Sequence, residues 1–78
     1  MKANNMNYFE LYLAGKHGYS AFVKSETITD PDEALEKAVE KNIIPLEDAK
    51  DIAHGAGYAE ERTEAEVANF APRLIHLI

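Results

Sequence analysis

The stretch TITDPDEALEKAVEKN, residues Thr27–Asn42, marks the point where a strand pattern ends and a helix begins. Asp30 can cap the helix, Pro31 falls at its first position, and Glu33 stands three residues after the cap, so three separate helix-start signals coincide. Apolar side chains recur at the spacing of one helical stripe: Ala34, Leu35, Ala38 and Val39. This face of the helix must be covered by the rest of the chain.

Two strands are predicted before this helix, at Tyr8–Ala14 and Tyr19–Glu26. Both alternate in the period-two manner of a sheet. In the first strand, Phe9, Leu11 and Leu13 lie on one side and Tyr8, Glu10 and Tyr12 on the other. The connection between the two strands is short, so we expect an antiparallel hairpin.

The turn decides which side chains face each other. A type I turn at residues 16–17, with Gly18 in the left-handed position, would place Leu11 opposite Val23 and Glu10 opposite Lys24. A two-residue loop would instead set Leu11 against Phe22, which is the less favourable pairing. We therefore expect the three-residue loop.

More helix is predicted after Asn42, which can end the first helix in a left-handed conformation. Residues 46–54 form the second helix, which ends at Gly55. Its expected inward side chains are Leu46, Ala49, Ile52 and Ala53.

The sequence of the C-terminal third fits more than one secondary structure. Thr63 followed by Glu66 is a capping-box pattern and predicts a third short helix over residues 63–71, while alternation over residues 61–67 would also fit a strand. Residues 73–78 are almost wholly apolar, which predicts a last strand buried on both faces, in or beside the middle of the sheet.

These elements predict an α+β domain: an N-terminal β-hairpin, two or three short helices on one face, and a C-terminal strand that completes a three-stranded sheet. Residues 1–6 are expected to be a frayed N-terminus, and residues 7–78 a single small domain.

Composition excludes several classes of function. The chain of 78 residues has no cysteine, so disulfides and thiolate metal sites are excluded. It has no apolar run long enough for a membrane span and no secretion signal at its start, so we expect a cytoplasmic protein without a membrane partner. The formal net charge is −6, and residues 26–78 carry five bases against thirteen acids. That surface would repel nucleic acid, and a basic protein is the better partner.

No group of residues has the pattern of a catalytic or metal-binding site. The histidines His17, His54 and His76 fall on a turn, a helix end and a terminal strand, without the spacing of metal ligands. No serine or threonine lies in a nucleophile elbow. We therefore expect no catalytic residues, no metal and no cofactor.

The second hairpin face carries the leading functional hypothesis. It bears Tyr8, Tyr12 and Phe22, with Glu10 and Lys24 between them. If the helices pack on the other face, this aromatic face stays open to a protein partner or to a second copy in a homodimer. The predicted function is a non-enzymatic protein-interaction module.

Two alternatives belong to other classes of function. The acidic helical surface could mimic nucleic acid and inhibit a basic nucleic-acid-binding protein. A small enzyme or metal site could also be assembled across a dimer, with His54 and nearby acids contributing.

Overall fold

The structure, a computed structural model, describes residues 6–14 and 18–77 as an α+β fold. The elements in chain order are β1 (Asn7–Leu13), β2 (Tyr19–Ser25), α1 (Pro31–Glu40), α2 (Leu46–Ala53), β3 (Gly57–Arg62), α3 (Glu64–Val67), the 3-10 helix η1 (Ala68–Arg73) and β4 (Ile75–His76). Of the expected frayed N-terminus, residues 1–6, the segment 1–5 lies outside the described residues.

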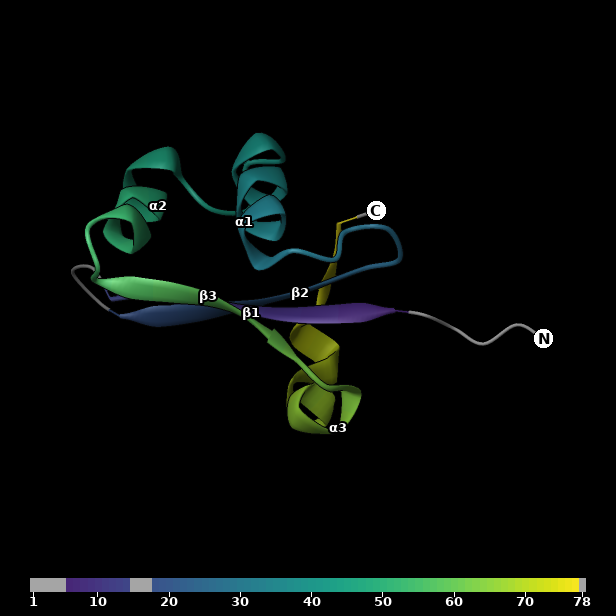
Figure 1. Cartoon of the computed structure of the whole chain (residues 1–78). Helices are drawn as coiled ribbons and strands as arrows, with labels where there is room; N and C mark the ends of the chain where they lie inside the picture. Colours follow the sequence, from purple (N-terminus) through teal and green to yellow (C-terminus); the bar gives the residue numbers. More distant parts are fainter. Residues whose placement is uncertain (1–5, 15–17, 78) are drawn as a thin grey trace.

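The sheet has four strands in the order β3-β1-β2-β4, so the predicted three-stranded sheet is wrong in its strand number. The pairs β1–β2 and β1–β3 are antiparallel, and β2–β4 is parallel. Helices α1 and α2 lie on one side of the sheet, and α3 lies on the other (Figure 1). We call these sides the inner face and the outer face. The predicted helix layer of two or three helices on one face thus consists of two, and the third helix, α3, lies on the opposite face.

The hairpin is confirmed, but its register differs from the expected one. Leu13 pairs with Tyr19 and Leu11 with Ala21, which shifts the partners by two residues. A shift of two keeps every side chain on its predicted face. Gly18 has a φ of 55°, as expected, while the predicted turn at residues 16–17 lies outside the described residues.

Helix α1 begins and ends as its sequence predicts. The Asp30 side chain accepts a hydrogen bond from the backbone N–H of Glu33 at 3.2 Å. At the other end Asn42 has a φ of 61°, and the N–H of Ile43 donates to the carbonyl of Ala38 at 2.9 Å. These are the cap and the Schellman motif of a well-defined helix.

The connection from β2 to α1 is held by two side chains. The buried Ser25 hydroxyl accepts from the backbone N–H groups of Thr27 and Ile28 at 3.1 and 3.0 Å. The Asn7 amide of β1 donates to the carbonyl of Ile28 at 2.9 Å. Ile28 is thereby fixed in the core, and α1 follows over the inner face.

Helix α2 covers the other end of the inner face, with Ala49 and Ile52 packed against the core. Leu46 was expected to point inward but is 64% exposed, and Ala53 is exposed as well. The contact with the sheet is made by the middle and last turns, and the first-turn residue Leu46 is left outside it.

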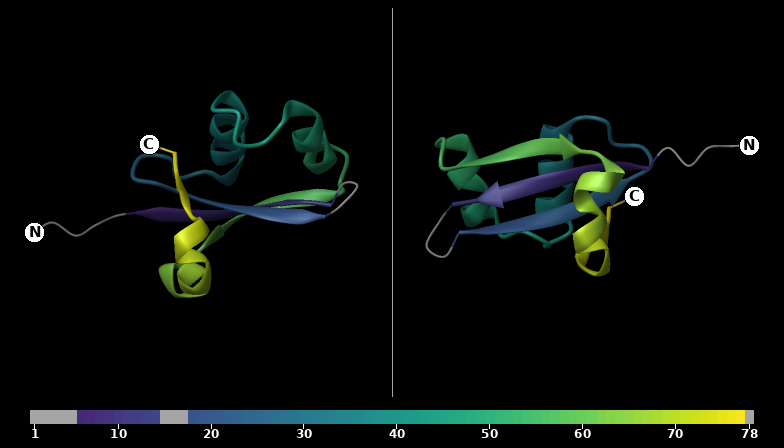
Figure 2. Two further views of the ribbon diagram at one scale, coloured as in Figure 1. Left: turned by 180° about the vertical axis from the view of Figure 1, so that it is seen from behind. Right: turned by 90° about the horizontal axis from the view of Figure 1, so that it is seen from below.

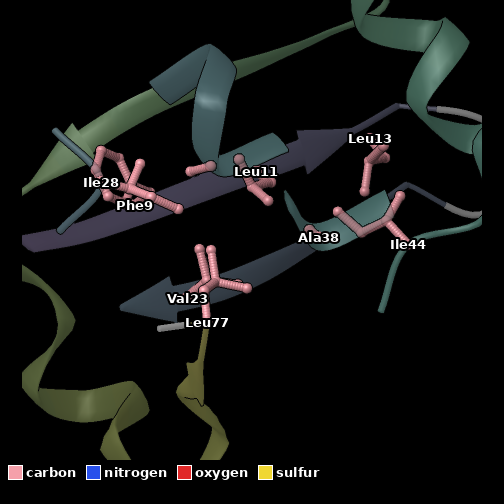
Figure 3. Close-up of a cluster of buried hydrophobic side chains, with 9 residues drawn as sticks. Phe9, Leu11, Leu13, Val23, Ile28, Ala38, Ile44 and Leu77 are labelled. Carbon is pink, nitrogen blue, oxygen red and sulfur yellow. The ribbon is translucent and has the colours of Figure 1, made fainter. Parts of the chain in front are cut away.

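The core lies between the inner face and the two helices (Figure 3). Its buried members come from β1, β2, α1, the two connections that flank α1 and the C-terminal segment: Phe9, Leu11, Leu13, Val23, Ile28, Ala34, Ala38, Ile44 and Leu77. Each described helix falls short of the length and hydrophobicity that a bilayer crossing requires.

Strand β3 is the element that the sequence did not predict. Gly57 makes it possible, because a Cβ at this position would lie 2.3 Å from the backbone oxygen of Tyr12. Ile52 of α2 lies over the same position. Only a glycine lets β3 start this close to β1.

Helix α3 forms where the capping box predicts it, and the alternative strand over residues 61–67 is wrong beyond Arg62. The Thr63 hydroxyl accepts from the N–H of Glu66, and the Glu66 carboxylate accepts from the N–H of Thr63. Burial of Val67 then holds α3 to the outer face.

The C-terminal segment is not a central strand. Strand β4 has two residues and lies at the sheet edge, and Ile75 is 38% exposed. Its apolar residues pack on both sides of the sheet instead. Leu74 contributes to the outer side beside Tyr8, while Leu77 enters the inner core beside Val23 (Figure 3). The C-terminal tail, residues 74–77, thus passes around the β2 edge of the sheet from the outer to the inner side.

Candidate functional site

The outer face presents nine side chains in a regular grid from β3, β1 and β2. Strand register sets the grid because alternate residues share a face. Its three rows are Arg62–Tyr8–Lys24, Glu60–Glu10–Phe22 and Tyr58–Tyr12–Ser20.

One end of this grid is covered by the chain itself. Phe22 stacks on Phe70 of η1 with ring centroids 4.2 Å apart. Tyr8 and Lys24 line a small cleft together with Val67 of α3. In the right-hand view of Figure 2, the α3 segment crosses the strands near one end of the sheet. The aromatic face is therefore not wholly open.

Within residues 6–14 and 18–77, no helix lies over the other end of the grid (Figure 2, right). Here the rings of Tyr12 and Tyr58 lie against each other, with centroids 5.2 Å apart and planes inclined by 31°. Tyr58 is 36% exposed and Ser20 is half-buried. With the neighbouring Glu60, these residues form what we call the open patch: Ser20, Tyr12, Tyr58 and Glu60.

Glu10 connects the open patch to the covered end. Its carboxylate accepts three hydrogen bonds, from Ser20 Oγ at 2.9 Å, from Tyr58 Oη at 3.1 Å and from Arg62 Nε at 3.0 Å. The Glu10 side chain is 15% exposed. A carboxylate taken out of water needs such donors, so the network holds the three strands together on this face.

Arg62 offsets the electrostatic repulsion between two carboxylates. Glu10 and Glu60 face each other directly across β1 and β3, which is destabilising for like charges. The guanidinium binds both, with Nε toward Glu10 and an Nη atom 2.7 Å from Glu60. Although burial works against the charged form, the hydrogen bonds to Glu10 and Glu60 raise the pKa of Arg62.

The arrangement is better suited to binding than to proton transfer. The two Glu10 oxygens are already occupied by donors, which leaves little capacity for a general base. Burial and the hydrogen bond to Glu10 raise the pKa of Tyr58, so this hydroxyl stays protonated in the physiological range. The open patch thus offers two aromatic rings and fixed hydroxyl groups.

The five predicted site residues do lie on one face, but they divide into two groups. Tyr8, Phe22 and Lys24 are at the covered end. Tyr12 belongs to the open patch, and Glu10 lies at the border. The expected pairing of Glu10 with Lys24 is wrong, because Lys24 lies opposite Tyr8 and Glu10 binds Arg62.

The sequence did not indicate Tyr58, Glu60 and Arg62 as site residues, because it did not predict strand β3. Residues 57–62 include one glycine, one alanine and two glutamates, residue types that strands disfavour. The available signal was the alternation of Tyr58, Glu60 and Arg62 with Ala59 and Glu61. Phe70 was assigned to a helix, but no sequence pattern linked it to Phe22.

The described histidines lie apart. His54 is exposed at the C-terminal end of α2, and His76 Nε2 lies 3.8 Å from Glu26. His17 is outside the described residues. Within residues 6–14 and 18–77, no three histidine or acidic side chains are placed to hold a metal ion.

Comparison with known proteins gives no relative: the chain matches no protein-family model, no curated protein and no solved structure.

Proposed function

We propose that the chain is a non-enzymatic protein-binding module that docks a positively charged protein on the open patch. The observation that carries this proposal is the Tyr12–Tyr58 pair, over which no helix of the described residues lies, whereas α3 and η1 cover the other end of the same face. The docking surface is thus smaller than the aromatic face as a whole.

Two tyrosines favour a protein as the ligand. A tyrosine ring gives a large apolar contact at a small cost in conformational entropy, and its hydroxyl can still hydrogen bond. Tyr58 is held in place by its bond to Glu10, and Tyr12 by its contact with Tyr58. A surface fixed in this way loses little freedom when a partner binds.

Charge favours a basic partner over a second copy of the chain. The Glu60 side chain is 52% exposed on the open patch, and the next residue, Glu61, is exposed on the inner face of the same edge strand. Two copies would bring together two net charges of −6, whereas a basic surface would be attracted.

Mimicry of nucleic acid would also select a basic protein, but through a different surface. This alternative rests on the exposed acidic residues of α1 and α2, the two helices on the inner side of the sheet: Asp32, Glu33, Glu36, Glu40 and Glu47. A contact on the open patch and a contact on α2 can be told apart by position.

Site-specific photo-cross-linking tests the proposal. A benzophenone amino acid replaces Tyr58 in one variant and the exposed Leu46 of α2 in a matched control. We expect a protein captured at position 58 and not at 46. Once purified, it should bind the wild-type chain in a salt-dependent manner, bind Leu46→Ser equally well, and bind the Tyr12→Ser, Tyr58→Ser double variant about tenfold more weakly.

Other results would count against this assignment. Capture at position 46 alone would support the inner-side surface of the nucleic-acid mimic. Capture of the chain's own copy at position 58 would indicate self-association. Equal binding of all variants to the purified partner would remove the open patch from the interface.

A further inference from the structure

The two edges of the sheet are unequal. On the β2 side the edge is covered by β4 and the tail, where the N–H of Leu77 donates to the carbonyl of Lys24 at 2.8 Å. On the other side β3 is the last strand, and no strand in the described part of the chain pairs with its outer edge. Strand β3 is six residues long, enough to pair with another segment.

The hydrogen-bond pattern shows which backbone groups of β3 point outward. The N–H of Ala14 donates to the carbonyl of Ala56 at 2.9 Å, and these residues are opposite each other in the β1–β3 register. In an antiparallel pair, directly bonded positions alternate with non-bonded ones. Tyr58, Glu60 and Arg62 therefore bond to β1, while Gly57, Ala59 and Glu61 direct their N–H and C=O groups to the open edge.

We propose that this edge binds an extended basic segment of the partner as a fifth strand, which rests on the proposed function and specifies its binding mode. Backbone hydrogen bonds to Gly57, Ala59 and Glu61 would supply affinity, and alternate side chains would supply specificity. The outer-face side chains of the added strand would lie beside Tyr58 and Glu60, next to the open patch.

Charge along the edge selects the occupant. Glu60 projects on the outer face and Glu61 on the inner face, and both are exposed. Arg62 is already paired with Glu10 and Glu60. Cross-strand pairs of opposite charge are favourable and like-charge pairs are not. The same glutamates that oppose pairing of two β3 edges therefore favour adjacent lysine or arginine residues in the added strand.

Helices α1 and α2 lie against the inner side of β3, where their apolar side chains would meet the inner side chains of the added strand. Ile52 lies over Gly57, and Ile52, Leu35 and Ala59 are half-buried side chains packed against the core. The segment that fits is thus an extended one, with apolar residues near Gly57 and Ala59 and basic residues near Glu60 and Glu61.

Amide hydrogen exchange followed by NMR tests the inference. The probe is a nine-residue peptide of alternating valine and threonine with two adjacent lysines at its centre, blocked at both ends. At saturation we expect the N–H groups of Gly57, Ala59 and Glu61 to exchange at least about tenfold more slowly, since they gain bonds. Those of Tyr58, Glu60 and Arg62 should change little. A peptide with two glutamates in place of the lysines should bind about tenfold more weakly.

A proline at position 59 separates backbone pairing from other modes of binding. Ala59→Pro removes an outward N–H and none of the bonds to β1, so the sheet should tolerate it. We expect about tenfold weaker peptide binding for Ala59→Pro and wild-type binding for the matched control Ala59→Ser. Retained slow exchange of the Tyr58 and Glu60 N–H groups would show that the variant is folded.

The two proposals fail in different ways. If peptide or partner binds with no protection at Gly57, Ala59 and Glu61, the fifth strand is wrong and the open patch stands. If these amides are protected in a dimer without peptide, the occupant is a second copy and the basic segment is wrong. If neither the peptide nor any protein binds at this side of the sheet, both proposals are wrong.

Discussion

Phe22 of β2 stacks on Phe70 of η1, with ring centroids 4.2 Å apart and planes 9° from parallel. This contact joins the C-terminal third of the chain to the outer face of the hairpin. Together with buried Val67, it decides which part of the aromatic face is covered and which part stays open.

Loss of the Phe70 ring should loosen this cover. We expect Phe70→Ala to lower the free energy of unfolding by about 2 kcal/mol, from lost apolar burial and the ring contact. Phe70→Leu, which keeps most of the apolar volume, should cost less. Urea denaturation measures both. Equal stabilities of wild type and Phe70→Ala would show that the stack does not hold η1 to the sheet.

The faces of the hairpin could be predicted from sequence, but not its register. Period-two alternation placed Phe9 and Leu11 inward and Tyr12 outward, as found. A shift by two residues leaves that pattern unchanged, so Leu11 facing Ala21 and Leu11 facing Val23 satisfy it equally. Only the turn could decide between them.

The sequence signals for helix ends predicted the structure correctly, whereas no sequence signal indicated which distant residues come into contact. The Asp30 cap, the Asn42 end of α1 and the Thr63–Glu66 capping box each depend on residues close in sequence, and all three are confirmed. The partners of Glu10 lie up to 52 residues away, so no local pattern reveals the Arg62 contact. Strand β3 was missed for its composition, and with it half of the open patch.

Removal of the Arg62 charge should expose the repulsion between Glu10 and Glu60. We expect Arg62→Met to lower the unfolding free energy by about 1 kcal/mol, since these pairs are partly exposed. In that background Glu60→Gln should recover part of the loss, whereas in the wild type it should be neutral or slightly destabilising. Thermal denaturation of the four proteins completes a double-mutant cycle. Additive effects would contradict the bridging role of Arg62.

The Ser25 hydroxyl should be important for folding. Ser25→Ala leaves two backbone N–H groups without their acceptor, and the hydrogen bond to the N–H of Ile28 is buried. We expect a loss of about 2 kcal/mol in chemical denaturation. Ser20→Ala, which removes a single half-buried hydrogen bond to Glu10, is the matched control and should cost clearly less. The reverse order would be inconsistent with Ser25 holding the β2–α1 connection.

Tyr19 should titrate above the ordinary pKa of a tyrosine. Burial, followed by its 2.7 Å hydrogen bond to Asp48, raises its pKa from 10.0 to about 12. A raised pKa means that the associated stability is fully present below the unfolded value near 10 and is lost as the pH rises through 12. Carbon-13 NMR of labelled tyrosine should show this midpoint, and Asp48→Asn should bring it back toward 10. The stability difference between wild type and Tyr19→Phe should be constant below pH 10 and change only above it.

Chemical-shift mapping of the isotope-labelled chain, titrated with the partner captured at position 58, tests the docking surface most directly. We predict that the shifted amide signals cluster on Tyr12, Tyr58 and the β3 edge, with any helix shifts confined to the neighbourhood of Leu35 and Ile52, and that the amide signals of the exposed helix acids Asp32, Glu36 and Glu47 do not move. Shifts concentrated on α1 and α2, with β3 unaffected, would contradict it.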